Sequence, residues 1–500
     1  MKTSSILSIS SLVVVFQVAC AADSDSLPLS VIQLVPSDFG TMTPERVIKE
    51  CSDAIIRMTG CESRKTADLY LRRAKAYFEL GQYQSAGNDL DHFLKLRPSD
   101  PEGRCRRVGV LFQVGKPREG MAEIHSIIKD HPHYAPAYAI LAAAYGQQKD
   151  YKMSIKFNTA AIRIDDSFEL SYYNRAIAYF YLKEYNKALD DINKSIELIP
   201  FRSSQRPECP YILRGDLLRK LGRSPQAIVN YVIARRLNPR SHSAFIGLWE
   251  AYHTLGKNSL CCVIAEDFTS TCPKQSIGYD FLARSFVEIG RFEDALRVGK
   301  QALELDKKDT DTMFLLAKLC VASANYKDAL NYLNLILRLD EMHLEASLLR
   351  IVILSGAHDS QYRDGLKATK SAFALCARTE NKDARCLLGL ARAKAECGNF
   401  ESAIEMTQRA IDLLPREAAA RKSYEMELEL YKERKPFRFP MLSPKEGQKV
   451  SPEKQGVGRT SRPIHSPKDL SCALFLTNHR VNHRELLDVC SCYADQYRKK

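Results

Sequence analysis

A repeat of 34 residues runs through most of this chain, and three columns of residues mark it. Each column recurs at the same place in successive repeats, apart from one 39-residue step between Ala188 and Ala227. A column of small residues contains Ala86, Gly120, Ser154, Ala188, Ala227, Cys261, Ala295 and Ala329. A turn column five residues earlier contains Gly81, Gly115, Lys149, Lys183, Gly222, Gly256 and Gly290. A closing column, twelve residues after the column of small residues, contains Pro98, Pro132, Asp166, Pro200, Pro239 and Pro273. A period of this length predicts an array of stacked helical hairpins.

Each column has its own physical role in such a hairpin. Glycine in the turn column ends the first helix, where a left-handed residue is needed. Proline in the closing column stops the second helix. A fourth column of small residues, seven places before the turn, lets the first helix approach its partner closely. Its members are Ala74, Ala142, Ala176, Gly215, Ala283 and Ala317. Because one hairpin cannot bury its apolar stripe alone, the repeats must share a continuous core.

These columns resemble those of the tetratricopeptide repeat family. The segment Leu71–Pro98 carries, in the family's order, Ala74, Tyr77, Gly81, Tyr83, Ala86 and Pro98. The segment Tyr172–Pro200 carries Ala176, Tyr179, Tyr185, Ala188 and Pro200. Frames of this kind begin at residues 67, 101, 135, 169, 208, 242, 276, 310, 344 and 384. The resemblance implies an all-α fold, a right-handed superhelical α-solenoid of about ten helix-turn-helix repeats. It does not identify a partner, because such arrays serve many unrelated functions.

The other segments flank the array, which we predict over residues 67–417. Residues 43–64 are predicted to form an N-terminal capping helix after a linker at 22–42, and residues 418–435 a charged C-terminal capping helix. Residues 432–470 hold ten Lys or Arg, four acids and six prolines, which predicts a disordered basic linker over 436–470. Apolar residues return in 471–500, where we expect a short helical tail.

The N-terminus has the pattern of a targeting signal. Lys2 precedes an apolar run from Ile6 to Cys20, and small residues at 19–21 form a cleavage pattern. We therefore predict a signal peptide over residues 1–21 and export to a periplasm, the ER lumen or the exterior. Two alternatives stay open, an uncleaved membrane anchor and an apolar start with no targeting role. The run is short for a bilayer span.

Export would make disulfides possible among the fifteen cysteines. Cys51 with Cys61, or Cys262 with Cys272, could close short loops. Cys261 and Cys320 fall in core columns instead, which predicts buried thiols. The chain has no Cys-x-x-Cys motif, so we expect no metal site.

No catalytic motif is present in the sequence. The chain lacks Gly-x-Ser-x-Gly, His-Glu-x-x-His and a glycine-rich phosphate loop, so we predict no catalytic residue, no cofactor and no enzyme activity. Residues 432–500 carry fifteen basic and seven acidic residues, or +8 of the total +13. This basic tail is either a solvated tether or a weak contact for an anionic surface. No nucleic-acid module is recognisable, so nucleic acid is not an expected partner.

In the tetratricopeptide family, the first helices of the hairpins line a concave groove. In the third to fifth frames this face is apolar and aromatic. The partner-binding residues that we predict there are Tyr173, Ile177, Phe180, Tyr181, Ile212, Asp216 and Arg219. Such a lining suits an extended or helical peptide held by apolar side chains. The alternative is that Tyr173, Ile177 and Phe180 pack neighbouring hairpins together.

Two functions fit these features. The first is a non-catalytic exported scaffold that binds a protein or peptide in the concave groove. The second is an accessory or targeting subunit of an envelope or ER-lumenal enzyme complex, for example one acting on glycans, in which the basic tail carries the targeting.

Overall fold

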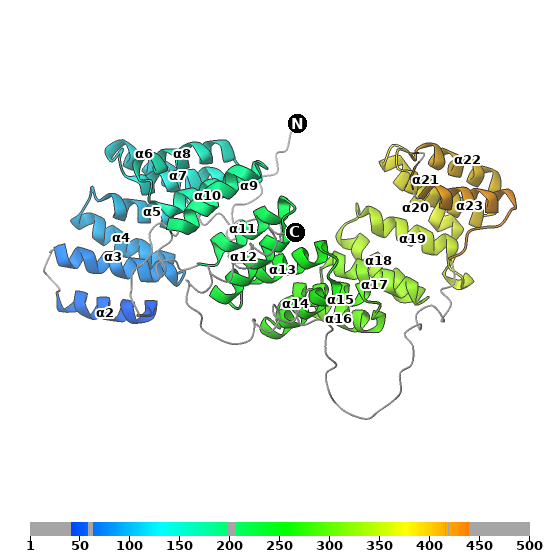
Figure 1. Cartoon of the computed structure of the whole chain (residues 1–500), viewed down its shortest axis with the longest axis horizontal. Helices are drawn as coiled ribbons and strands as arrows, with labels where there is room; N and C mark the ends of the chain where they lie inside the picture. Colours follow the sequence, from blue (N-terminus) through cyan, green and yellow to red (C-terminus); the bar gives the residue numbers. More distant parts are fainter. Residues whose placement is uncertain (1–41, 59–63, 199–206, 416, 419, 440–500) are drawn as a thin grey trace, which may run out of the picture. The chain divides into compact units, whose positions relative to one another are not determined.

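The computed structural model describes residues 42–58, 64–198, 207–415, 417–418 and 420–439. Over these residues the protein has 22 α-helices, one short 3-10 helix and no strand (Figure 1). The predicted all-α solenoid is therefore confirmed. The signal peptide predicted at 1–21, the linker up to residue 41 and everything from residue 440 onward lie outside the described residues.

The chain divides into two units, with the boundary in the array after Lys257. The described helices of the first unit are α2 (Pro44–Arg57), α3 (Arg64–Glu79), α4 (Tyr83–Leu96), α5 (Pro101–Gln113), α6 (Pro117–Asp130), α7 (Ala135–Gln147), α8 (Tyr151–Ile164), α9 (Glu169–Tyr181), α10 (Tyr185–Leu198), α11 (Cys209–Lys220), α12 (Ser224–Leu237) and α13 (His242–Thr254). From α3 to α12 they pair into hairpins one to five, and α13 is the first helix of hairpin six.

The second unit continues the same scheme. Its helices are α14 (Asn258–Thr271), α15 (Ser276–Glu288), α16 (Phe292–Leu305), α17 (Thr310–Ala322), α18 (Tyr326–Leu339), α19 (Leu344–Gly356), η1 (Ser360–Tyr362), α20 (Gly365–Arg378), α21 (Ala384–Glu396), α22 (Phe400–Asp412) and α23 (Ala420–Lys432). From α15 to α22 they pair into hairpins seven to ten. The longer ninth repeat has a physical cause, because η1 and its flanking loop separate α19 from α20.

A left-handed residue at the turn position ends the first helix of hairpins one to eight and ten. Gly81 has φ of 73°, and its neighbour Gln82 donates its backbone N–H to the Tyr77 carbonyl at 2.9 Å. This is the hydrogen bond that closes a helix C-terminus. Lys149 and Lys183 adopt φ of 62° at the same place without being glycine. The turn position therefore fixes the backbone whichever residue fills it.

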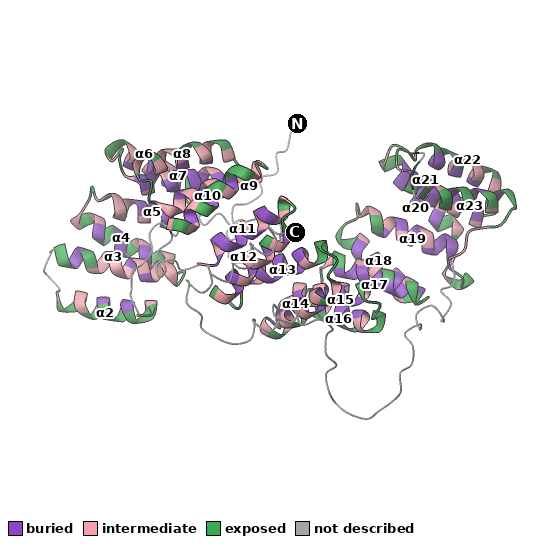
Figure 2. Ribbon diagram, in the orientation of Figure 1, coloured by how far each residue is buried: buried purple, intermediate pink, exposed green. Residues whose placement is uncertain are grey.

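The small-residue column lies inside the hairpins. Ala86, Ala188 and Ala295 are fully buried, and buried residues lie along the faces where neighbouring helices meet (Figure 2). Cys261 and Cys320 are buried, as predicted. Cys262 carries a free thiol, so the short loop proposed to Cys272 is not closed by a disulfide.

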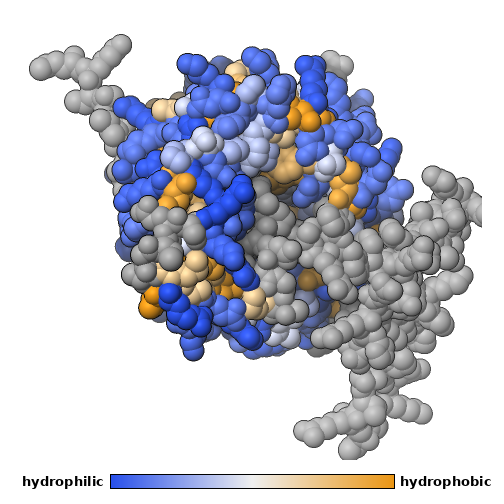
Figure 3. Space-filling model, turned by 90° about the vertical axis from the view of Figure 1, so that its left-hand side faces the viewer, coloured by the Kyte–Doolittle hydropathy of each residue, from blue (hydrophilic) through white to orange (hydrophobic). Residues whose placement is uncertain are grey.

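Both ends of the array carry a helix outside the repeats. α2 buries Val47 and Cys51 against Ala76 of α3, and α23 buries Tyr431 against α21 and α22. In Figure 3, which looks at the side where α2 lies in Figure 1, hydrophilic residues cover most of the described surface. None of the described helices is long and apolar enough to cross a membrane.

Candidate functional site

The predicted face begins on α9, where Tyr173 and Ile177 are buried. They pack with Ala188 of α10 and with Leu213 and Leu217 of α11, so they join hairpin four to hairpin five. Ile212 of α11 is also buried. The structure thus places these three side chains in the core, where they stabilise the stack. Their contact with a partner remains a prediction.

Two further aromatic residues at the end of α9 are only partly buried. The Tyr181 ring stacks on that of Tyr151, with 4.7 Å between the centroids, and meets Phe180 edge to face at 5.9 Å. Phe180 also contacts Tyr185 edge to face at 5.7 Å. The rings hold one another in place, and each leaves part of its surface accessible. Rigid aromatic surface of this kind is well suited to holding a ligand.

Asp216 of α11 is bound by Tyr231 of α12, the second helix of the same hairpin. The Tyr231 hydroxyl of α12 donates to Asp216 Oδ1 at 2.5 Å, although Tyr231 itself is fully buried. Its ring lies between two glycines of adjacent first helices, where an added Cβ would come within 2.6 Å of the ring at Gly215 and closer still at Gly247. These glycines make the space between α11 and α13 through which the ring reaches the carboxylate.

An ion pair continues this polar cluster onto α13. Arg219 lies 2.7 Å from Glu250 Oε2 and 3.9 Å from Asp216 Oδ1. Burial raises the pKa of Asp216 to about 6, while the Tyr231 hydroxyl and the Arg219 charge oppose that rise. The cluster therefore holds two carboxylates and one guanidinium in a partly buried setting. It can accept hydrogen bonds from backbone or cationic donors of a ligand.

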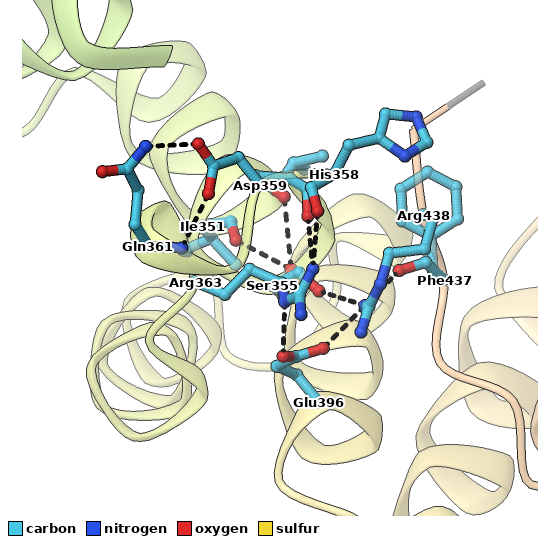
Figure 4. A network of polar contacts seen from close by, with 11 residues as sticks. Ile351, Ser355, His358, Asp359, Gln361, Arg363, Glu396, Phe437 and Arg438 are labelled. Carbon is cyan, nitrogen blue, oxygen red and sulfur yellow. Dashed lines mark hydrogen bonds and ion pairs between the residues drawn. The ribbon is translucent and has the colours of Figure 1, made fainter. Parts of the chain in front are cut away.

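The second unit carries a polar cluster that the sequence did not predict. Glu396, the last residue of α21, binds two arginines: Arg363 at 2.9 Å and Arg438 at 2.6 Å (Figure 4). Arg363 also donates to the backbone carbonyls of Ala357 and His358 at 2.9 and 3.0 Å. The loop after α19 is thereby fixed around the Glu396 carboxylate.

Arg438 belongs to a segment that we predicted as the start of a disordered linker. The structure corrects that boundary for residues 436–439, which pack against α19 and α21. The composition of this stretch, basic and rich in proline, concealed the packing. A sequence signal did exist, because Phe437 and Phe439 are the only Phe, Tyr or Trp residues between 432 and 470.

The described residues contain no group of three or more His, Cys, Asp or Glu side chains that could hold a metal ion. The polar clusters at Asp216 and Glu396 instead pair carboxylates with guanidinium or hydroxyl groups. Both are arrangements that bind hydrogen-bond donors and cations.

Comparison with known proteins gives three matches to models of the tetratricopeptide repeat, over residues 67–100, 170–201 and 287–350. A TPR repeat-containing protein of Methanocaldococcus jannaschii is 26% identical over 193 residues, 39% of this chain and 30% of that protein. The DnaJ homolog subfamily C member 3 homolog of Dictyostelium discoideum is 27% identical over 164 residues, 30% of this chain and 32% of that protein. The chain thus spans about a third of the length of these relatives.

Among solved structures, that of yeast Tom70 aligns with 78% of this chain and 94% of its own, with a TM-score of 0.40 and 13% identity. The matched repeat segments fall on hairpins of both units. The hairpins between them have the same helix lengths and the same left-handed turns. The chain thus contains tetratricopeptide repeats in both units.

Proposed function

We propose that this protein is a non-catalytic scaffold that binds a protein or peptide partner on the first helices of hairpins four to six, α9, α11 and α13. Tetratricopeptide arrays are protein-interaction scaffolds, and the proposal assigns this role to one face of the first unit. The observation that carries it is the partly buried cluster of Asp216, Arg219 and Glu250 on α11 and α13, together with the aromatic pair Phe180 and Tyr181 at the end of α9.

The chemistry of this face suits a peptide better than a small molecule. Accessible ring surface at the end of α9 offers apolar contacts, while the carboxylates on α11 and α13 offer acceptors for backbone N–H groups and cations. The core residues Tyr173 and Ile177 support the surface from beneath. A partner would therefore be held by a few aromatic contacts and by charge-assisted hydrogen bonds.

We also propose that the chain is exported. The support is the sequence of residues 1–21, with a basic start, an apolar run and a small-residue cleavage pattern. Expression in a secreting host, followed by N-terminal sequencing of the product, tests this. A mature chain that begins at Ala22 supports export with cleavage, and a product that retains Met1 contradicts it.

A pull-down from the exported fraction tests the scaffold proposal and identifies the partner by mass spectrometry. The double variant Tyr181→Ala with Glu250→Gln should weaken capture of that partner at least tenfold, because it removes one ring and one acceptor. Its control is Phe373→Ala with Glu405→Gln, two exposed residues on α20 and α22. Equal losses in the two double variants would contradict the proposed surface.

The accessory-subunit alternative places the decisive contact in the basic tail. A chain that ends at Phe439 separates the two functions, because it keeps every described residue and removes the tail. Retained capture of the partner favours the groove. Loss of capture by this truncation, with the Tyr181 and Glu250 variant unaffected, favours the tail.

A further inference from the structure

After α23, the last of the described helices, the chain crosses α19 and α21, the first helices of hairpins nine and ten. Residues 436–439, which follow α23 after an interval of three residues, run in an extended conformation over the ends of α19 and α21 (Figure 4). The Phe439 backbone N–H donates to the Gly356 carbonyl at 3.0 Å. The segment is thus held partly through its backbone, as a bound peptide is.

The Phe437 ring is held by contacts with several residues of the neighbouring helices. The Arg392 guanidinium lies 4.3 Å from the centre of the Phe437 ring, a distance for a cation–π contact. Arg392 is itself fixed by two hydrogen bonds to Glu427 of α23, at 2.8 and 2.5 Å. On the other side the ring lies against Gly356, where an added Cβ would come within 2.8 Å of Phe437 Cδ1. Only a residue without a side chain at 356 leaves this space.

Arg438 and Phe439, the next two residues of the segment, also contact the neighbouring helices. Arg438 Nη1 lies 2.6 Å from Glu396 Oε2 and donates to the Ser355 carbonyl at 3.3 Å. The Phe439 ring stacks on Tyr326 with 6.0 Å between the centroids. In order along the segment, an aromatic, a cationic and an aromatic side chain therefore contact the helices.

The residues that contact the segment also take part in interactions with the rest of the fold. Glu396 also pairs with Arg363, Arg392 also binds Glu427, and Gly356 ends α19, and none of these interactions involves the segment. The segment adds no regular secondary structure, and each of its four residues stays partly exposed. The segment therefore lies on residues that other contacts also hold, as a bound peptide lies on its site, with Phe437 and Phe439 partly buried against two core clusters.

We propose that the groove of hairpins nine and ten is a second peptide-binding site, specific for an extended aromatic–arginine–aromatic segment of a partner protein. In the isolated chain, Phe437, Arg438 and Phe439 occupy it. A partner peptide with the same pattern binds by displacing them. This site lies in the second unit and is separate from the surface on α9, α11 and α13.

Tethering determines how strongly the chain's own segment competes. A short linker holds a ligand near its site at an effective concentration of about 1 mM. A separate peptide that binds the empty site with a Kd of about 100 μM would therefore appear roughly tenfold weaker on the occupied protein. Release of the segment should expose the full affinity.

The test uses a fluorescent peptide with the sequence of residues 434–440, Arg-Lys-Pro-Phe-Arg-Phe-Pro, and the full-length chain. Fluorescence anisotropy should show roughly tenfold tighter binding to the variant Phe437→Ala with Phe439→Ala than to the wild type. Adding Glu396→Gln to that variant should weaken binding at least tenfold. A peptide with Glu in place of the central Arg should also bind at least tenfold more weakly.

Phe373→Ala is the matched control, because Phe373 of α20 is 68% exposed, and it should leave peptide binding at the wild-type level. If loss of both rings disturbs hairpin ten, Arg438→Glu releases the segment by repulsion from Glu396 and keeps the rings. Equal affinity of wild type and both released variants would overturn the proposal, as would equal binding of the Arg and Glu peptides. Neither result bears on partner capture by the Tyr181 and Glu250 surface, so the two proposals fail separately.

Discussion

Asp216 in the first unit and Glu396 in the second are both carboxylates on first helices, but Asp216 is bound by a second helix and Glu396 by the segment that follows α23. Tyr231 passes between α11 and α13 from the second-helix layer to donate its hydroxyl to Asp216. Arg438 comes from the segment that crosses α19 and α21, and it pairs with Glu396 at 2.6 Å (Figure 4). A shielded carboxylate needs such a partner, because burial without one is costly.

The difference separates a folding contact from a binding contact. The Tyr231 ring is fully buried and is part of the core, so its loss must disturb the stack of hairpins. The side chain of Arg438 is 30% exposed and belongs to a segment at the edge of the fold. Changes around Asp216 should therefore alter stability, and changes around Glu396 should alter occupancy of the groove.

Gly247→Ala should have the largest effect on stability. The new Cβ would overlap the edge of the Tyr231 ring, coming within 2.7 Å of its Cδ1 atom, and the ring has little room to move away, because an added Cβ at Gly215 would also come within 2.6 Å of it. Overpacking of this kind costs about 3 kcal/mol or more when no side chain can yield. Chemical denaturation followed by circular dichroism measures the loss.

Gly389→Ala is the matched change in the second unit. Gly389 also lies within a first helix, but its Cβ would meet Ile351 at 3.5 Å, an ordinary contact. Replacing a mid-helix glycine by alanine without a clash should be neutral or stabilise by up to about 1 kcal/mol. Similar losses of stability in the two variants would show that the clash with the Tyr231 ring is not the cause of the loss in Gly247→Ala.

The pH dependence of stability should differ between wild type and Asp216→Asn. The pKa of Asp216 is raised from 3.8 to about 6, so the folded state binds the proton more tightly than the unfolded chain does. The free energy of unfolding should therefore fall as the pH rises from about 4 to about 6, by roughly 2–3 kcal/mol from this group. An amide in place of the carboxyl cannot ionise, so this contribution should disappear in the variant.

Denaturation of both proteins between pH 4 and 7 measures the difference, and parallel curves would contradict the raised pKa. Asp280→Asn gives the comparison in the second unit, where burial also raises the pKa of Asp280 against the opposing charge of Arg284. Its stability difference should have the same sign.

Tyr231→Phe should cost about 1–2 kcal/mol at pH 7, because it leaves Asp216 without its hydroxyl donor. It should also move the pH-dependent fall to higher pH, since the hydroxyl favours the ionised carboxylate. Arg438→Ala should cost less than about 1 kcal/mol, because Glu396 keeps Arg363 and the lost pair is partly exposed. Denaturation at pH 7 compares the two variants. A larger loss for Arg438→Ala would reverse the distinction between core and groove.

The repeat columns predicted the hairpins and their turns because each column reports a local backbone requirement. They could not separate a packing residue from a binding one. Tyr173 and Ile177 have the spacing and character of either, and only the position of α11 shows that they are buried. Helical periodicity identifies a face of a helix and not the neighbour that covers it.

The sequence was least informative where contacts join distant segments. Gly356 lies outside the turn column, and its role depends on Phe437, which is 81 residues further along the chain. Gly247 likewise has meaning only through Tyr231 on the preceding hairpin. Proline and basic residues around 436–439 predicted a linker. Composition indicates whether a segment favours solvent, but it cannot show that distant helices offer contacts for two of its side chains.

The smallest expected effect lies in the turns, where the two units should not differ. Lys149 in the first unit and Ala324 in the second both have positive φ, 62° and 57°, at the place that glycine fills in most repeats. A residue with a Cβ is strained there by about 1 kcal/mol, whereas glycine loses more freedom on folding. Lys149→Gly and Ala324→Gly should therefore each leave stability unchanged or raise it by up to about 0.5 kcal/mol. Thermal unfolding of the two variants checks this. If only one of these variants lost about 1 kcal/mol or more of its free energy of unfolding, the turns of the two units would differ. The units would then differ at their turns as well as in the partners of Asp216 and Glu396.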